Sequence, residues 1–186
     1  MTGRLVVIVG PSGVGKGTVV RRLRSLYPEI WFSVSATTRA PRPGETHGVE
    51  YLFISEEEFL NLDTSGGMLE TAEVFGLNQY GTIAAPVDEA VARGDIALLE
   101  IDIDGARQVK ARRPEAFTVF IAPPSFEELA RRLQSRGTET PEVVATRLAT
   151  AREELLAIDE FDAVVVNDSV ERAARELAEI IGLPPR

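Results

Sequence analysis

The chain has 186 residues, of which 29 are acidic and 20 basic, so its formal net charge is −9, and it contains no cysteine. This length is enough for one compact core and short for two independent ones. The lack of cysteine excludes disulfides, thiolate metal sites and a cysteine nucleophile. Because the acidic surface repels polyanions overall, a nucleic-acid partner is disfavoured.

The first residues, Met1 to Arg4, run directly into an apolar segment, and no apolar run approaches the length needed to cross a membrane. We therefore expect no signal peptide, no membrane partner and a cytoplasmic location. The sequence leaves the oligomeric state open.

The first predicted elements are a buried strand over residues 5–9 and a helix over residues 16–26. A glycine-rich segment joins them: Gly10, Pro11, Ser12, Gly13, Val14, Gly15, Lys16, Gly17 and Thr18. Glycines allow backbone N–H groups to wrap around an anion at a helix N-terminus, and a lysine after the last glycine reaches the β- and γ-phosphates. A glycine-rich cap without a ligand is the alternative, but it does not require that lysine. The segment predicts a phosphate-binding loop for ATP.

One position departs from the usual pattern of such loops. Gly17 stands where many of them carry the Ser or Thr that binds Mg²⁺, and Thr18 follows one place later. We expect Mg²⁺ to bind together with ATP, with a contact to the protein that runs through water rather than directly through a hydroxyl.

Residues 33–84 differ from the rest of the chain, because they combine short alternating strands, Gly and Pro turns and a small acidic helix at 56–62. From residue 85 onward, helices and near-continuous apolar strands alternate, which predicts a parallel sheet covered on both faces with ligands at the carboxyl ends of its strands. The expected helices are 85–93, 105–112, one starting at Ser125 with a Ser125–Glu128 capping box, 141–158 and 170–181. The expected strands are 96–101, 117–121 and 163–166.

Two arginines, Arg39 and Arg42, lie in a loop that Pro41 and Pro43 stiffen. Guanidinium groups at this spacing can bind one phosphate dianion bidentately. A solvated basic loop is the alternative, and the spacing alone does not decide between the two.

The loop at 10–18, the stretch from Ser33 to Tyr51, the segment Leu98-Leu99-Glu100-Ile101-Asp102 and the segment 136–140 follow one another as in guanylate kinases. The chain resembles that family along essentially its whole length. The resemblance implies transfer of the γ-phosphoryl group of ATP to GMP, giving ADP and GDP. It implies one α/β domain with a phosphate-loop three-layer fold: a parallel-sheet core (1–32, 85–124 and 159–186), an inserted GMP-binding part (33–84), and a short lid with its flanking helices (125–158).

The resemblance also assigns roles to residues. For the guanine base it implies a hydroxyl from Ser35, the carboxylate of Glu70 and a further hydroxyl from Thr82. For the GMP phosphate it implies a clamp of Arg39, Arg42, Tyr51 and Tyr80. It places Asp102 near the nucleotides with Glu100 beside it, and it implies that Arg132, Arg136 and Arg147 approach the transferring phosphates together with Lys16.

These residue types suit the chemistry. Guanine offers an acceptor at O6 and donors at N1 and N2, so a hydroxyl beside a buried carboxylate such as Glu70 selects it over adenine. Phosphoryl transfer depends mainly on positioning and on charge neutralisation, so no protein nucleophile is required.

Several alternatives stay open. Asp102 either caps the following helix or holds a water of Mg²⁺, and the two roles are compatible. Asn167 and Asp168, after the last strand, either contact adenine or start the final helix. Gln79 and Ala84 depart from residues frequent in the family. The rival functions are a non-catalytic interaction module of guanylate kinase type and a kinase for another phosphorylated acceptor.

Overall fold

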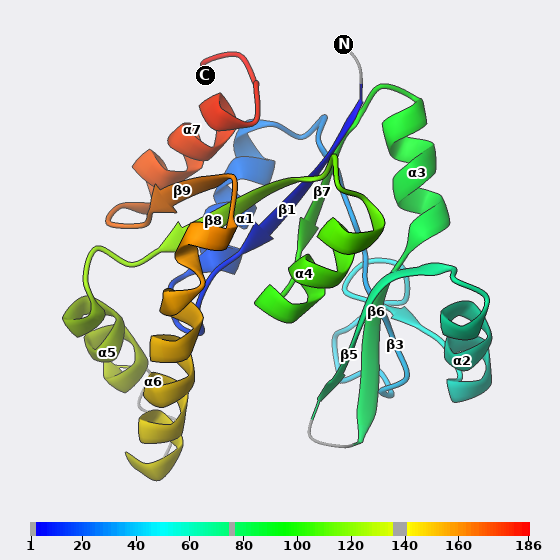
Figure 1. Ribbon diagram of the computed structural model, residues 1–186, viewed down its shortest axis with the longest axis horizontal. Helices are drawn as coiled ribbons and strands as arrows, with labels where there is room; N and C mark the ends of the chain where they lie inside the picture. The colour runs from blue at the N-terminus through cyan, green and yellow to red at the C-terminus, as the bar shows by residue number, and fades with distance from the viewer. Residues whose placement is uncertain (1–2, 75–76, 136–140) are drawn as a thin grey trace. The chain divides into compact units, whose positions relative to one another are not determined.

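The computed structural model describes residues 3–74, 77–135 and 141–186 (Figure 1). The chain forms two compact units. The first comprises Met1–Leu5, Trp31–Leu99 and Asp104–Ala116, and the second comprises Val6–Ile30, Glu100–Ile103 and Phe117–Arg186. Each unit is therefore assembled from segments that are far apart in the sequence.

Parallel strands form the core of the second unit. Strand β8 (Phe117–Ala122) pairs on one side with β1 (Arg4–Val9) and on the other with β9 (Ala163–Val166). The apolar residues of β1 from Val6 to Val9 are completely buried. Such continuous burial explains why this strand has an uninterrupted apolar sequence rather than an alternating one.

The helices of the second unit connect these strands, and Figure 1 shows α5 beside α6 and α7 beside β9. A bidentate ion pair joins α1 to α7, with Arg22 Nε 2.6 Å from Glu171 Oε2. The elements are α1 (Lys16–Leu26), α5 (Phe126–Ser135), α6 (Pro141–Leu156), the 3₁₀ turn Ile158–Glu160 and α7 (Val170–Ile180).

The first unit contains a parallel strand pair and a separate four-stranded sheet. Strand β2 (Trp31–Phe32) pairs in parallel with β7 (Ile96–Glu100). The four-stranded sheet has the order β4-β3-β6-β5. Its strands are β3 (Ala36–Thr37), β4 (Leu52–Phe53), β5 (Met68–Val74) and β6 (Asn78–Ile83), and the helices of this unit are α2 (Glu56–Thr64), α3 (Ala84–Ala92) and α4 (Ile103–Arg112).

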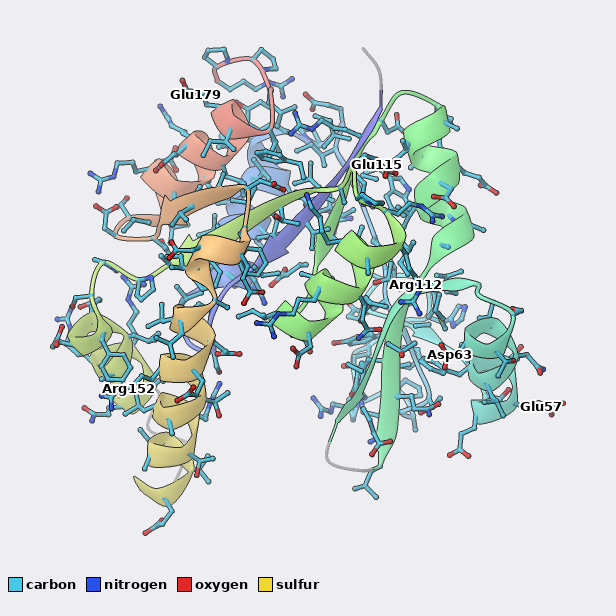
Figure 2. The ribbon with its side chains drawn as sticks, viewed as in Figure 1. Glu57, Asp63, Arg112, Glu115, Arg152 and Glu179 are labelled. Carbon is cyan, nitrogen blue, oxygen red and sulfur yellow. The ribbon has the colours of Figure 1, made fainter. Side chains whose placement is uncertain are left out.

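A small apolar cluster of Ala36, Phe59 and Met68 joins α2 to the four-stranded sheet. The helix starts with a capping box, in which Ser55 Oγ accepts the N–H of Glu58 and the Glu58 carboxylate accepts the N–H of Ser55. Glu57 and Asp63 lie on the exposed part of this helix (Figure 2).

Helix α4 also contacts the hairpin of β5 and β6. Arg112, labelled in Figure 2, donates through Nη1 to the carbonyl of Leu69 at 2.8 Å. The side-chain amide of Gln108 pairs with both backbone groups of Thr71. Backbone groups of β5 that lack a strand partner on this side are therefore satisfied by α4.

The α/β fold class with a parallel-strand core is confirmed, and the predicted elements recur within a few residues. Three details differ. Helix α4 begins at Ile103, two residues before the expected start. Strand β2 was not predicted, because two residues carry no periodicity. In the expected Ser125 box, the N–H of Glu128 donates to Ser125, while the Glu128 carboxylate accepts from Arg131 and Arg132.

The division into core, GMP-binding part and lid is defined by the ligands that each part is expected to bind or cover, so it stays a prediction. Within the expected lid region 125–158, residues 136–140 lie outside the described residues. Within the residues that the structure describes, no helix has both the length and the apolar character needed to cross a membrane.

A hydrogen-bonded pair of buried Thr118 and exposed Asp162 ties β8 to the start of β9, and it generates a stability prediction. The Asp162 carboxylate accepts from both the N–H and the hydroxyl of Thr118 at 2.8 Å, and Thr118 Oγ1 accepts the N–H of Asp162. Thr118→Val removes this buried hydroxyl, so we expect the free energy of unfolding in urea to fall by about 1–3 kcal/mol. Thr150→Val, at an exposed helix position, serves as the control and should change it by less than about 0.5 kcal/mol. Equal effects of the two variants would contradict this role of the pair.

Candidate active site

The glycine-rich segment forms a tight loop after β1 in the second unit. Helix α1 begins at Lys16, and its N-cap Gly15 has a left-handed backbone with φ of 90°. A Cβ at Gly10 would lie 2.5 Å from the carbonyl oxygen of Ile121 in β8. Glycine is therefore required at Gly15 by conformation and at Gly10 by close approach of the neighbouring strand.

Two side chains hold the loop through a single carbonyl group. The Val14 carbonyl accepts from Asn167 Nδ2 at 2.8 Å and from Arg132 Nη1 at 3.2 Å. Because C=O and N–H point in opposite directions across a trans peptide, these two bonds turn the N–H of Gly15 away from Asn167 and Arg132. Two side chains from outside the loop thus hold this peptide in one orientation.

Asn167 lies where the sequence suggested either an adenine contact or a helix start. It is buried, its N–H donates to the Ala122 carbonyl at 2.8 Å, and α7 begins at Val170 after the N-cap Ser169. Asn167 therefore does not start the helix, and its side chain supports the loop instead. The adenine contact stays a prediction.

The guanidinium of Arg132 is fixed by three partners. Besides the Val14 carbonyl, it donates to the Asn167 carbonyl at 3.0 Å and to the Glu128 carboxylate at 2.8 Å. The sequence prediction that Arg132 approaches the transferring phosphates stays untested. The structure adds a supporting role for the loop that sequence reasoning missed.

Lys16 is half-buried, and its ammonium donates to the Ile101 carbonyl at 2.9 Å. Desolvation lowers the pKa of Lys16 below the 10.5 of an ordinary lysine, although the negative charges of Glu100, Asp102 and Glu154 oppose this shift. A cavity of about 410 Å³ opens at the loop. It is lined by Gly10, Pro11, Ser12, Gly13, Gly15, Lys16, Gly17, Thr18, Arg21, Glu100, Asp102 and Glu154.

Two carboxylates of this cavity are suitable neighbours for a nucleotide-bound Mg²⁺. Glu100 lies against Gly17, since a Cβ at Gly17 would be 3.2 Å from Glu100 Oε1, and Asp102 directly precedes α4. Desolvation raises the pKa of Glu100, while Lys16 and Arg21 lower it. The Thr18 hydroxyl accepts from Arg21 at 3.1 Å. Among the residues in the described ranges, no three His, Cys, Asp or Glu side chains cluster as a metal site.

Arg147 also reaches the loop. From α6, its Nε and Nη2 donate to Ser12 Oγ at 3.2 and 2.8 Å. The structure thus brings Arg132 and Arg147 to the glycine-rich loop, and their expected approach to the transferring phosphates stays a prediction. Arg136 lies outside the described residues.

A second polar group lies in the first unit, on the β5–β6 hairpin. Glu70 and Thr82 face each other in the strand register, both are buried, and Thr82 Oγ1 donates to Glu70 Oε1 at 2.7 Å. Ser35 directly precedes β3, and its carbonyl accepts the N–H of Leu52. The three residues expected to bind guanine therefore lie within one sheet or at its border, and their contacts with the base stay a prediction.

The expected phosphate clamp is partly assembled in the same unit. Arg39 donates through Nε to Tyr80 OH at 3.2 Å, and its guanidinium lies 5.5 Å from the ring centre of Tyr51. The two tyrosine rings contact each other edge to face at 5.7 Å. Arg42 belongs to the exposed loop that follows. Desolvation raises the pKa of Tyr51, so this phenol stays protonated and able to donate.

Sequence reasoning missed the carboxylate partner of this clamp. Glu45 accepts from Arg39 Nη2 at 2.9 Å and from the N–H of Arg42 at 2.7 Å. These bonds, above all that of Arg39, lower the pKa of Glu45. The available signal was an acidic residue directly after the basic, proline-containing loop. Glu45 thus forms an ion pair with Arg39, the first arginine of the expected clamp.

Comparison with known proteins decides the family. The family model described as guanylate kinase matches residues 2–183. The guanylate kinase of Bifidobacterium longum is 56% identical over 183 residues, covering 96% of this chain and 93% of the relative. The chain belongs to the guanylate kinase family.

Other guanylate kinases agree with this assignment. That of Nocardia farcinica is 58% identical over 179 residues and covers 96% of this chain and 93% of its own. The crystal structure of guanylate kinase from Anaplasma phagocytophilum has a TM-score of 0.75 at 37% identity, covering 97% of this chain and 85% of that one. The similarity therefore includes both units of this guanylate kinase family member.

The lowered pKa of Lys16 predicts how nucleotide binding by this guanylate kinase family member depends on pH. The positive charge is lost as the pH rises through that pKa, so we expect the affinity for ADP to decline at a pH below 10.5. Titration calorimetry at increasing pH measures this decline. Lys16→Arg stays protonated and should lack it, whatever its affinity at neutral pH. The same decline in both proteins would exclude Lys16 as its cause.

The bond from Asn167 to Val14 predicts a selective kinetic effect. Asn167→Ala removes a buried donor, so we expect the KM for ATP to rise about tenfold or more while the KM for GMP changes little. Asn167→Asp keeps the shape but lacks the N–H donor, and steady-state kinetics should show a comparable loss. Normal ATP kinetics in the Asp variant would mean that shape, rather than hydrogen-bond donation, supports the loop.

Proposed function

We propose that the chain transfers the γ-phosphoryl group of ATP to GMP, forming ADP and GDP. Membership of the guanylate kinase family supports this reaction, and so does the presence of a phosphate loop with Lys16 at the start of α1. We place this activity in purine nucleotide metabolism in the cytoplasm. The substrates are ATP and GMP, with Mg²⁺ bound together with ATP.

The single observation that carries the choice of acceptor is the buried pair of Glu70 and Thr82. A carboxylate accepts from the N1–H and 2-amino groups of guanine, whereas adenine presents an acceptor at N1. The Thr82 hydroxyl donates to Oε1 of this carboxylate at 2.7 Å and restrains its orientation. Glu70 with Thr82 and Ser35 would thus select the base.

The phosphate of GMP would bind to Arg39, Arg42, Tyr51 and Tyr80. Arg39 is already oriented by Tyr80 and Glu45, so little side-chain freedom remains to be lost when GMP binds. The phosphate dianion would take over the position of the Glu45 carboxylate on Arg39, because a guanidinium donates paired hydrogen bonds to either kind of oxyanion.

On the ATP side, the N–H groups of the loop and Lys16 would bind the β- and γ-phosphates. When bound, Mg²⁺ would supply positive charge that neutralises the negative charge developing during transfer. Glu100 and Asp102 would hold its water ligands. Arg132, Arg136 and Arg147 would stabilise the charge on the transferring phosphoryl group, and the reaction requires no covalent intermediate on the protein.

The test measures ADP formation with different nucleotide acceptors, in the wild type and in a variant of Glu70, the residue proposed to bind guanine. We expect ADP formation from Mg-ATP to be rapid with GMP and slow with AMP or UMP, and absent with every acceptor in Lys16→Met. Glu70→Gln should lower kcat/KM for GMP about 100-fold or more, since a buried acceptor becomes a donor facing N1–H. Glu73→Gln, an exposed position on the same strand, is the matched control. An unchanged preference for GMP in Glu70→Gln would refute the role of Glu70. If the wild-type protein formed no ADP with any acceptor, that result would favour a non-catalytic interaction module of guanylate kinase type.

A further inference from the structure

A carboxylate of the protein occupies part of the phosphate loop. Glu154, near the end of α6, accepts the backbone N–H of Ser12 through Oε2 at 3.1 Å. It also belongs to the lining of the 410 Å³ loop cavity. Its charge reaches Lys16, whose pKa it raises against the effect of desolvation. Neither the loop motif nor the expected set of site residues includes Glu154.

This contact is of the kind that a phosphate oxygen makes. Backbone N–H groups of such loops serve oxyanions, and a carboxylate oxygen bound to one of them imitates a ligand. Three acidic side chains, Glu100, Asp102 and Glu154, line a cavity that is to receive a polyanion. Glu100 and Asp102 are placed for a cation and its water, whereas Glu154 is bonded to the loop itself.

Helix α6 also brings the cationic side chain of Arg147 to Ser12. Arg147 precedes Glu154 by two helical turns, so both project from one face of the helix. The guanidinium of Arg147 binds Ser12 Oγ, while the carboxylate of Glu154 binds Ser12 N. An incoming phosphate is attracted by the first side chain and repelled by the second.

We propose that Glu154 is an internal competitor of the nucleotide phosphates and that it thereby determines the affinity for ATP and ADP. It neutralises the loop when no nucleotide is bound, and the bound phosphates displace its carboxylate from Ser12. Arg147 remains at Ser12 to bind the phosphate that arrives. The competition weakens binding and speeds the release of ADP. This proposal rests on the proposed function only in taking ATP and ADP as the ligands.

A purely structural role of Glu154 makes the opposite prediction. If the carboxylate only braced the loop in its binding-competent shape, its removal would loosen the loop and weaken nucleotide binding. Competition predicts tighter binding, since one repelling charge is lost and one N–H is released. The sign of the change in affinity therefore separates the two roles.

The experiment measures binding to Glu154→Gln by titration calorimetry. The amide keeps the size of the side chain and removes its charge. We expect the Kd for Mg-ADP and for tripolyphosphate, an anion without a base, to fall about fivefold or more, as the loss of a single close charge repulsion implies. The difference in Kd between Glu154→Gln and the wild type should become smaller as salt is added, because salt screens the charge repulsion. Glu153→Gln, an exposed neighbour with the same change in net charge, should bind both ligands as the wild type does.

Unchanged or weaker binding in a Glu154→Gln protein that melts cooperatively would overturn the proposal. If that variant does not fold, Glu154→Ala must show the same direction of change. A further readout comes from the Ser12 amide in the absence of nucleotide. Its NMR resonance should shift in Glu154→Gln and not in Glu153→Gln, and equal spectra would also overturn the proposal. No GMP is present in these measurements, so an enzyme that fails to phosphorylate GMP would leave their outcome intact.

Discussion

The orientation of the peptide between Val14 and Gly15 is the constraint on which the ATP site depends. Its carbonyl accepts two hydrogen bonds from outside the loop, one from Asn167 after β9 and one from Arg132 on α5. A peptide held in this way costs no reorganisation when an anion arrives, which is the condition for strong electrostatic stabilisation. The glycines of the loop permit this arrangement, and the side chains of two distant segments make it the stable one.

In each of the two proposed binding groups, an acidic side chain contacts a group that we propose to bind phosphate. In the first unit Glu45 is paired with Arg39, and in the second unit Glu154 is bonded to Ser12. Cations and N–H groups that together bind a polyanion need another partner when the polyanion is not bound, because leaving buried polar groups unpaired costs free energy. In a chain with a net charge of −9, local carboxylates supply that partner. In both units, therefore, a carboxylate is paired with the groups that we propose to bind phosphate.

Much of the fold was predictable because its signals are local. The apolar run at 5–9 and the loop spacing to Lys16 predicted β1 and the start of α1, and the structure confirms both elements. Glu70 and Thr82 could be chosen through the family resemblance, but their mutual hydrogen bond follows from the register of β5 and β6, which no local pattern encodes. The contacts of Asn167 and Glu154 with the loop were missed for the same reason, because their partners lie 153 and 142 positions away in the sequence. Glu45 lies only 6 positions from Arg39, so its acidic character after the basic loop was a local signal that was overlooked.

The most direct test of this account is a crystal structure of the protein with a non-hydrolysable ATP analogue and Mg²⁺. The account predicts phosphate oxygens within hydrogen-bond distance of the Gly15 and Lys16 backbone nitrogens, with the Val14 carbonyl still bound to Asn167 and Arg132. A phosphate chain bound elsewhere, or a Val14–Gly15 peptide turned around relative to the free protein, would contradict it.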